Sequence, residues 1–425
     1  MNSSPAVVLK SSSLLACLGF ALSVAGEGRA AEWVDVLGPS GSLRGTAWSQ
    51  SKDYAEDRAY TEGSLWLTLR PEEIAGFKFY ADGFVAKEDL GHKAQTASSL
   101  REFFVEKSID RFDFKLGRMI TVWGRADKVN PTDQFSVRDF RRATINDEDQ
   151  LEGIGSAQIA INFDELRLIA LWTPEWRSPR YPLPEQPGIR LGTEEPDTPE
   201  KQWGLKVDRS GGAIDWSLSY FQGYSKTPDI ALRAADASGV DLALNFSPIR
   251  AWGADFASTI GAWGLRGEIA YRTSDDRDGK DPTLQNPETF LVLGVERSPW
   301  EDFNINLQAL YKHVEHYQDL ASYTAPLEAT LARFNQVTSN QLAADQYGYS
   351  LRPSLKLLSQ TLEAEVAYVE WQPVFSSLTR PKITYAVNDH LKASIGGEVY
   401  RGRQASFFGR LRALSSGFAE VRWGF

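Results

Sequence analysis

Cysteine is almost absent from this sequence of 425 residues, which contains only Cys17. One thiol cannot form an internal disulfide, so the chain is not a small secreted fold held together by disulfides. Structural zinc sites usually need three or four cysteine or histidine ligands, and only four histidines are scattered along the chain. We therefore expect no metal and no cofactor.

Long apolar runs and basic clusters are also missing. No stretch of 18 apolar residues occurs after residue 30, which excludes a protein that crosses a membrane with helices. The formal net charge is −10 and no basic stripe is visible, so we expect no nucleic-acid partner. The nucleophile elbow, the phosphate-binding loop and the dinucleotide fingerprint are absent too, so we do not expect an enzyme.

The first thirty residues have the pattern of a targeting segment. Lys10 precedes an apolar stretch from Leu14 to Ala25, and Gly28 and Ala30 place small residues before a cleavage site. The apolar stretch is shorter than the roughly 20 residues that a membrane-spanning helix needs. We predict a signal peptide over residues 1–30, followed by a single domain over residues 31–425.

Alternation of apolar and polar residues dominates the sequence from residue 43 onward. Ile305 and Leu307, for example, alternate with Asn304, Asn306 and Gln308. Successive side chains of a strand point to opposite faces, so each such segment has one apolar face and one polar face. A soluble sandwich would show the same alternation, with its apolar face turned inward.

Segment length and spacing favour a membrane barrel over a sandwich. The alternating segments are about ten residues long, enough to span a bilayer at a tilt and longer than most soluble strands. Short connections alternate with long ones over residues 122–154, 174–200, 224–250 and 315–344. Short periplasmic turns and long extracellular loops are typical of transmembrane barrels.

These patterns predict an all-β fold, a transmembrane antiparallel β-barrel of about 18 strands. The count assigns residues 240–246 to a loop although they also resemble a strand, and about 16 strands is the alternative. An even count brings both ends of the barrel to the periplasmic side. A barrel of this size is too wide for side chains to fill, so inward charges such as Lys206, Glu268 and Glu365 would line water.

The last strand carries a pattern of its own. Ala419, Val421, Trp423 and Phe425 share one face of it. We interpret Val421, Trp423 and Phe425 as the signal that a barrel presents to the assembly machinery of the bacterial outer membrane. The outer-membrane bilayer is therefore the expected location of the mature chain.

Tryptophans near the predicted strand ends are expected to form aromatic girdles at the two membrane surfaces. These tryptophans are Trp48, Trp172, Trp252, Trp263 and Trp371.

The connection over residues 122–154 is the candidate functional site. We hypothesise that it folds into the lumen and narrows the pore, with Arg138, Arg141 and Arg142 facing the acidic residues 147–149. The alternative is that Trp123, Asp127, Asn130 and Asp133 only lock the loop against the barrel wall. The candidate residues are Trp123, Arg125, Asp127, Asn130, Asp133, Arg138, Asp139, Arg141 and Arg142.

Two motifs carry a resemblance to a known group of proteins. Residues 123–133 contain the pattern W-G-x-x-D…N-P-x-D, and residues 172–175 contain W-x-P-E. In both, the sequence resembles a large, uncharacterised family of bacterial outer-membrane barrels. The resemblance implies a porin-like protein, with no substrate and no catalytic residues attached to it.

The function that these observations favour is a porin-like channel for passive diffusion of ions or small polar solutes in a Gram-negative outer membrane. The alternative is the barrel component of an export, lipid-handling or multiprotein envelope system, in which a partner occupies the lumen. The sequence leaves the oligomeric state and the solute open.

Overall fold

The computed structural model describes residues 36–51, 58–183, 187–236 and 239–425. The predicted signal peptide and its cleavage site lie outside these residues. Within the described ranges, no helix is both long enough and apolar enough to cross a membrane.

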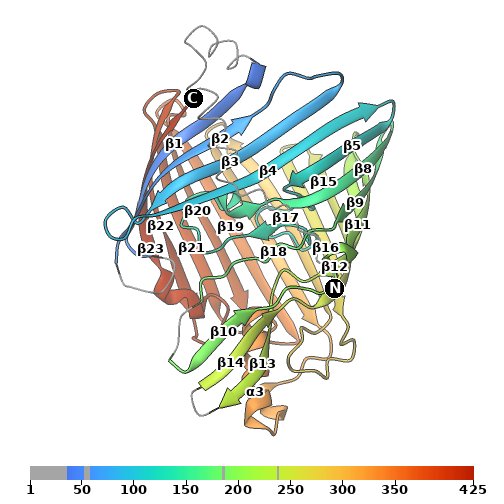
Figure 1. Cartoon of the computed structure of the whole chain (residues 1–425). Helices are drawn as coiled ribbons and strands as arrows, with labels where there is room; N and C mark the ends of the chain where they lie inside the picture. The colour runs from blue at the N-terminus through green and yellow to red at the C-terminus, as the bar shows by residue number, and fades with distance from the viewer. Residues whose placement is uncertain (1–35, 52–57, 184–186, 237–238) are drawn as a thin grey trace, which may run out of the picture.

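Eighteen antiparallel strands form a closed barrel, in which each strand pairs with its neighbours along the chain (Figure 1). The last strand pairs with the first, from Ser42 opposite Gly424 to Trp48 opposite Phe418, so the sheet has no free edge. The strands are β1 (Pro39–Trp48), β2 (Tyr60–Leu69), β3 (Phe77–Glu88), β4 (Gln95–Ile109), β5 (Phe112–Met119), β8 (Ile154–Phe163), β9 (Leu166–Thr173), β11 (Gln202–Arg209), β12 (Ile214–Tyr224), β15 (Pro248–Ile260), β16 (Trp263–Ser274), β17 (Glu288–Trp300), β18 (Phe303–Val314), β19 (Asp345–Leu357), β20 (Leu362–Gln372), β21 (Ser376–Ala386), β22 (Leu391–Gly402) and β23 (Ser416–Gly424).

The connections differ between the two ends of the barrel. At the end where β1 begins and β23 ends, the turns are short, as at residues 110–111, 164–165 and 301–302. At the opposite end, the connections are mostly long, covering residues 120–153, 174–201, 225–247 and 315–344. We call these the short-turn end and the long-loop end.

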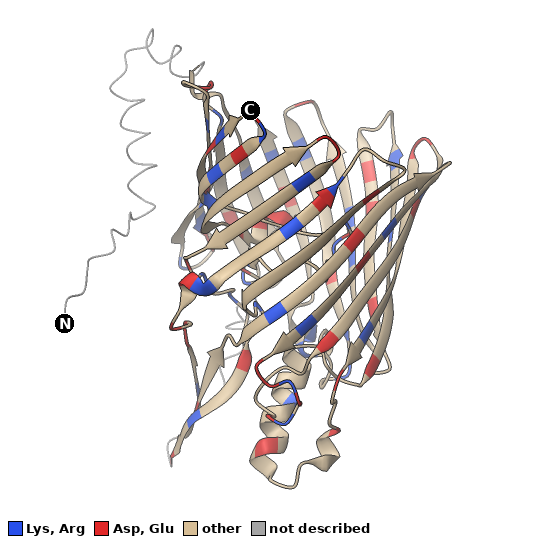
Figure 2. Cartoon of the chain, turned by 90° about the vertical axis from the view of Figure 1, so that its right-hand side faces the viewer, with Lys and Arg blue, Asp and Glu red and all other residues tan. Residues whose placement is uncertain are grey.

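The two faces of the barrel are inverted relative to a soluble protein. On β18, Leu307 is 43% exposed on the outer face, whereas its neighbour Gln308 is fully buried inside. Ile395 and Val421 are likewise exposed, whereas Glu268 is 2% exposed. Figure 2 shows charged residues of both signs along the barrel strands. An apolar outer surface and a polar interior are typical of a membrane barrel, and the predicted fold class with 18 strands is confirmed.

Three of the five predicted girdle tryptophans lie on the outer surface. Trp172, Trp252 and Trp263 are 49%, 44% and 43% exposed. Trp252 continues an aromatic row across neighbouring strands, with ring centroids 5.4 Å from Tyr220 and 5.8 Å from Tyr271. Such a row of amphipathic rings suits a membrane–water boundary.

The assignment of Trp48 and Trp371 to the girdles is wrong, because both side chains point into the barrel. Trp48 is 1% exposed and packs on Phe418 with ring centroids 4.9 Å apart. Trp371 is 6% exposed and lies 5.6 Å from the ring of Phe290. Position near a strand end does not fix the face, which follows from the alternation along each strand.

A small cap projects from the long-loop end (Figures 1 and 2). It contains a separate three-stranded sheet and a helix, which Asn335 joins through hydrogen bonds to the backbone N–H and C=O of Ile230 at 2.7 and 3.2 Å. Residues 240–245 belong to this sheet, so they lie outside the barrel as predicted, although they do form a strand. The cap elements are β10 (Ile189–Thr193), β13 (Asp229–Asp236), β14 (Gly239–Asn245) and α3 (Pro326–Thr338).

The remaining short elements lie in connections. They are β6 (Val137–Arg138), β7 (Leu151–Glu152), and the 3-10 helices η1 (Asp147–Gln150), η2 (Pro199–Lys201), η3 (Leu320–Ser322) and η4 (Gly409–Leu414).

Candidate functional site

Residues 120–153, which connect β5 to β8, form a loop that contacts inward-facing side chains of many barrel strands. We call this segment the lumen loop. It contains β6 and β7, two antiparallel strands of two residues each, and the 3-10 helix η1 between them. Its contacts fall into an apolar anchor, a carboxylate anchor and a series of ion pairs.

The apolar anchor consists of two aromatic rings of the lumen loop. Trp123 and Phe135 pack edge to face at 4.8 Å, and Phe135 meets the inward ring of Phe221 on β12 at 4.8 Å. Gly204 on β11 makes this possible, because a Cβ there would lie 2.7 Å from atoms of both loop rings. The first residue of the sequence motif therefore holds the loop to one wall.

The carboxylate anchor is Glu268, an inward residue of β16. Its carboxylate accepts hydrogen bonds from the backbone N–H groups of Arg125, Ala126 at 2.5 Å and Thr132 at 3.4 Å. The Thr132 hydroxyl donates a fourth at 3.0 Å. Hydrogen bonds to an ionised acceptor are stronger than neutral ones, so this residue fixes two parts of the loop at once.

Gly124 allows the loop backbone to approach Glu268 this closely. Its φ is +108°, in the region that favours glycine, and a Cβ there would lie 2.5 Å from a Glu268 oxygen. A glycine therefore stands at this position of the W-G motif because any side chain would clash with Glu268.

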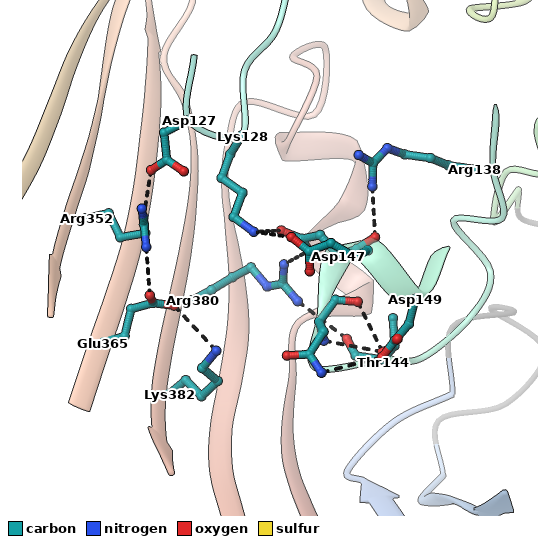
Figure 3. A network of polar contacts seen from close by, with 12 residues as sticks. Asp127, Lys128, Arg138, Thr144, Asp147, Asp149, Arg352, Glu365, Arg380 and Lys382 are labelled. Carbon is teal, nitrogen blue, oxygen red and sulfur yellow. Dashed lines mark hydrogen bonds and ion pairs between the residues drawn. The ribbon is translucent and has the colours of Figure 1, made fainter. Parts of the chain in front are cut away.

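Ion pairs join the lumen loop to further strands. Arg125 contacts Asp208 on β11 at 2.6 Å and also pairs with Asp255 on β15. On another part of the wall, Asp127 pairs with Arg352 of β19 at 2.7 Å, and Arg352 also contacts Glu365 of β20 at 3.1 Å (Figure 3).

A second group of ion pairs surrounds η1. Asp147 pairs with Arg380 of β21 and lies 3.5 Å from Lys128 (Figure 3). Burial alone would raise the pKa of the Asp147 carboxyl, but Arg380 and Lys128 outweigh it and hold that pKa below its usual value. Asp149 pairs with Arg44 of β1 at 2.7 Å. The lumen loop is therefore tied to strands on opposite parts of the closed barrel.

Asp133 and Asn130 shape the loop itself. The Asp133 carboxylate accepts hydrogen bonds from the backbone N–H groups of Phe135 and Ser136, both at 3.3 Å, and from the Ser136 hydroxyl. The Asn130 carbonyl oxygen of the backbone accepts from the Asp133 N–H at 3.2 Å. These contacts match the locking role that the sequence left open for this motif.

The predicted opposition of arginines and acids differs from the observed pairing. Arg138 donates to the backbone oxygen of Asp147 at 2.8 Å, but not to its carboxylate. Arg141 pairs with Asp139 at 3.3 Å, and Arg142 pairs with Glu152 at 3.3 Å. The ion-pair partners of the carboxylates of residues 147–149 are instead Arg380, Lys128 and Arg44.

The wall partners Arg44, Arg352 and Arg380 were not among the predicted site residues. Each is an inward residue of a strand, and alternation alone indicates its face. No motif marks them, since many other inward positions carry charge.

The W-x-P-E motif covers the last two residues of β9 and the start of the next connection, and it contacts the strands on either side of the lumen loop. Glu175 pairs with Arg118 at 2.9 Å and accepts the Gly155 N–H at 2.5 Å. Trp172 points outward, and its indole N–H donates to the Glu200 backbone oxygen at 2.8 Å.

The lumen loop separates two cavities. The inner cavity, of about 460 Å³, lies toward the short-turn end and is lined by Ser42, Arg44, Trp66 and Arg422 among others. The outer cavity, of about 290 Å³, lies toward the long-loop end between the lumen loop and strands β16 to β18.

The predicted assembly signal lies at the barrel seam. Val421 and Trp423 are 54% and 45% exposed on the outer face of β23, opposite Gly45 and Leu43 of β1. Phe425 exchanges backbone hydrogen bonds with Gly41 at 3.0 and 3.1 Å. Its role in assembly stays a prediction.

Comparison with known proteins places this architecture in a family. A family model described as "protein of unknown function (DUF1302)" matches residues 44–405. The chain belongs to the DUF1302 family. No curated protein matches the sequence.

Solved structures with a similar fold include three proteins of Pseudomonas aeruginosa. The outer membrane protein OpdK has a TM-score of 0.56 at 10% identity, covering 91% of this chain and 98% of OpdK. OccK5 (OpdH) has a TM-score of 0.53 at 11% identity, covering 92% and 98%. OccK10 (OpdN) has a TM-score of 0.52 at 13% identity, covering 91% and 98%. The DUF1302 chain therefore has the fold of an outer-membrane porin barrel.

Proposed function

We propose that this DUF1302 protein is a porin-like channel of the bacterial outer membrane, through which ions or small polar solutes diffuse passively. The lumen loop forms its constriction. The observation that carries the proposal is the attachment of one loop to β1, β11, β16 and β21 inside a closed barrel with a polar interior. A loop attached to several strands in this way narrows the path through the barrel, and no separate plug domain is needed for that.

Charge at a constriction governs which ions pass. In the lumen loop, each of Arg125, Asp127 and Asp147 forms an ion pair with a residue of opposite charge. The charges within each pair largely cancel. We therefore expect weak selectivity between potassium and chloride.

We further propose that residues 1–30 direct export and that Val421, Trp423 and Phe425 are read by the outer-membrane assembly machinery. The support for the assembly role is the exposed outer position of Val421 and Trp423 on the strand that closes the barrel, with Phe425 directly after it. Replacing Phe425 with Ser should lower the amount of folded protein in the outer membrane, whereas Ser at the exposed Ile395 should not. Equal amounts of the two variants would contradict the assembly role.

The channel is tested by recording the purified protein in a planar bilayer. We expect discrete conductance steps in KCl, and Arg380→Gln should change the step size because it frees Asp147 and the η1 end of the loop. Arg266→Gln is the control, since Arg266 also lies inside the barrel but pairs with Glu296 away from the loop. A folded protein that stays silent, or that purifies with a partner, would favour the barrel of a multiprotein envelope system.

A further inference from the structure

The outer cavity has the composition of a binding site for a small organic anion. It lies between the lumen loop and the inner faces of β16, β17 and β18, and Pro179, Tyr181 and Lys226 of the long connections also line it. Its volume of about 290 Å³ equals roughly ten water molecules at ~30 Å³ each. That space suits a molecule with a single ring.

Positive charge exceeds negative charge in the lining. Arg138, Lys226, Arg272 and Lys312 line the cavity with only two carboxylates. One of these is Glu288, whose two oxygens are occupied by Arg272 at 2.8 Å and Lys312 at 3.2 Å. Within the lining, one carboxylate therefore faces two cations, so the cavity surface carries more positive than negative charge here. Asp229 also interacts with Arg272, but it does not line the cavity.

The second carboxylate is also occupied. Asp133 accepts its hydrogen bonds from Phe135 and Ser136, within its own turn of the loop. The cations, in contrast, keep donors available. A guanidinium carries five N–H groups and an ammonium three, whereas the described contacts of Arg272 use one and those of Lys312 go to Glu288 and Ser339.

Aromatic and apolar residues form a further part of the lining, beside the neutral polar residues Asn130, Gln134, Ser136, Thr227 and Ser339. Phe140, which is 36% exposed, stacks on Tyr181 with ring centroids 5.2 Å apart, and Phe290 approaches from β17. Pro131, Pro179 and Ala270 complete the apolar surface. A bare inorganic anion would leave these surfaces in water, whereas a flat ring would cover them.

We propose that the outer cavity binds aromatic organic anions, with the anionic group at Arg272 and Lys312 and the ring between Phe140 and Phe290. The site lies on the long-loop side of the constriction, so such a solute would occupy it before it passes the lumen loop. This inference rests on the proposed channel for its role in transport, but binding itself does not require conduction.

The first experiment measures binding of benzenesulfonate to the detergent-solubilised barrel by titration calorimetry. We expect saturable binding of benzenesulfonate and none of benzylammonium. Arg272→Gln should weaken binding at least about tenfold, because it removes a charge-assisted contact. Arg266→Gln is the matched control, since Arg266 lies on the same strand and pairs with a β17 glutamate at 2.5 Å but does not line the cavity. Equal binding by the two variants would overturn the proposal.

A second variant separates the ring site from the charges. Phe140→Leu removes the aromatic ring, so it should weaken the binding of benzenesulfonate several-fold. It keeps every cation of the cavity, so the affinity for sulfate should be unchanged. If it weakens neither, the ring does not lie there and the proposal fails.

Bilayer recordings then connect the site to transport. Benzenesulfonate should interrupt the KCl current at concentrations that match its calorimetric affinity. A silent bilayer together with intact binding would refute the channel and leave the site standing. An active channel without binding would refute the site alone.

Discussion

Replacing Glu268 with Gln should loosen the lumen loop without unfolding the barrel. The carboxylate accepts four hydrogen bonds, from the N–H groups of Arg125, Ala126 and Thr132 and from the Thr132 hydroxyl. A glutamine amide offers one acceptor oxygen, and among the four donors only the Thr132 hydroxyl can turn and accept from its NH2 group. At least two of the four hydrogen bonds to a charged acceptor are therefore lost.

The expected magnitude follows from the charge of the acceptor. Hydrogen bonds to charged groups contribute about 1.5–3 kcal/mol each, so losing two weakens the anchor by roughly 3–6 kcal/mol. A change of ~5.5 kcal/mol is enough to invert a two-state equilibrium from 1:99 to 99:1. The rings of Trp123 and Phe135 and the ion pairs remain, so the loop should exchange between attached and detached states but stay connected to the wall.

Single-channel recording is the assay. Wild-type protein should show steady open currents, and Glu268→Gln should show fluctuations between at least two levels and a larger maximum conductance. Glu296→Gln is the control. Glu296 lies on the inner face of β17, and its contacts are with Arg266 and Asn304 of neighbouring strands instead of the lumen loop. If both variants fold and conduct like the wild type, Glu268 does not hold a constriction and the reasoning is refuted.

Three further predictions concern other contacts. Gly204→Val should displace the rings of the apolar anchor and lower the free energy of unfolding in urea by about 1–3 kcal/mol. Gly45→Val is the control and should not lower it, because a side chain at Gly45 meets open space. Arg352→Gln should leave the carboxylates of Asp127 and Glu365 without the cation that they share. The reversal potential in a KCl gradient should therefore shift toward potassium selectivity. An unchanged reversal potential would show that these carboxylates do not lie on the ion path. Burial lowers the pKa of Lys226 to about 7, so its positive charge is lost as the pH rises through that value. Benzenesulfonate should accordingly bind more weakly at pH above about 7 than below it, and Lys226→Met should remove that pH dependence, as calorimetry at several pH values would reveal.

The barrel was predictable because its determinants are local. Alternation such as that of Ile305, Leu307 and Gln308 reports the face of each residue directly, and the structure places these side chains outside, outside and inside. The same rule places Trp48 inside the barrel, on the face that it shares with Arg44, although it lies at a strand end.

The partners of the lumen loop were not predictable in the same way. Arg44, Arg352 and Arg380 lie 105, 225 and 233 residues away from the carboxylates with which they pair. Which inward residue meets which loop residue depends on the circumference of the barrel and the path of the loop. A single sequence contains neither, so the expected opposition of the loop arginines to residues 147–149 rests only on their charges and their closeness in the sequence.

Cysteine accessibility tests most directly whether ions pass the lumen loop. In a Cys17→Ser background, a cysteine replaces Gln134, which lines the outer cavity, or Leu307, which is 43% exposed on the outer face. A charged, membrane-impermeant thiol reagent should reduce the single-channel current of the Gln134→Cys barrel and leave that of Leu307→Cys unchanged. Full modification of Gln134→Cys with no change in current would show that ions do not pass along this loop.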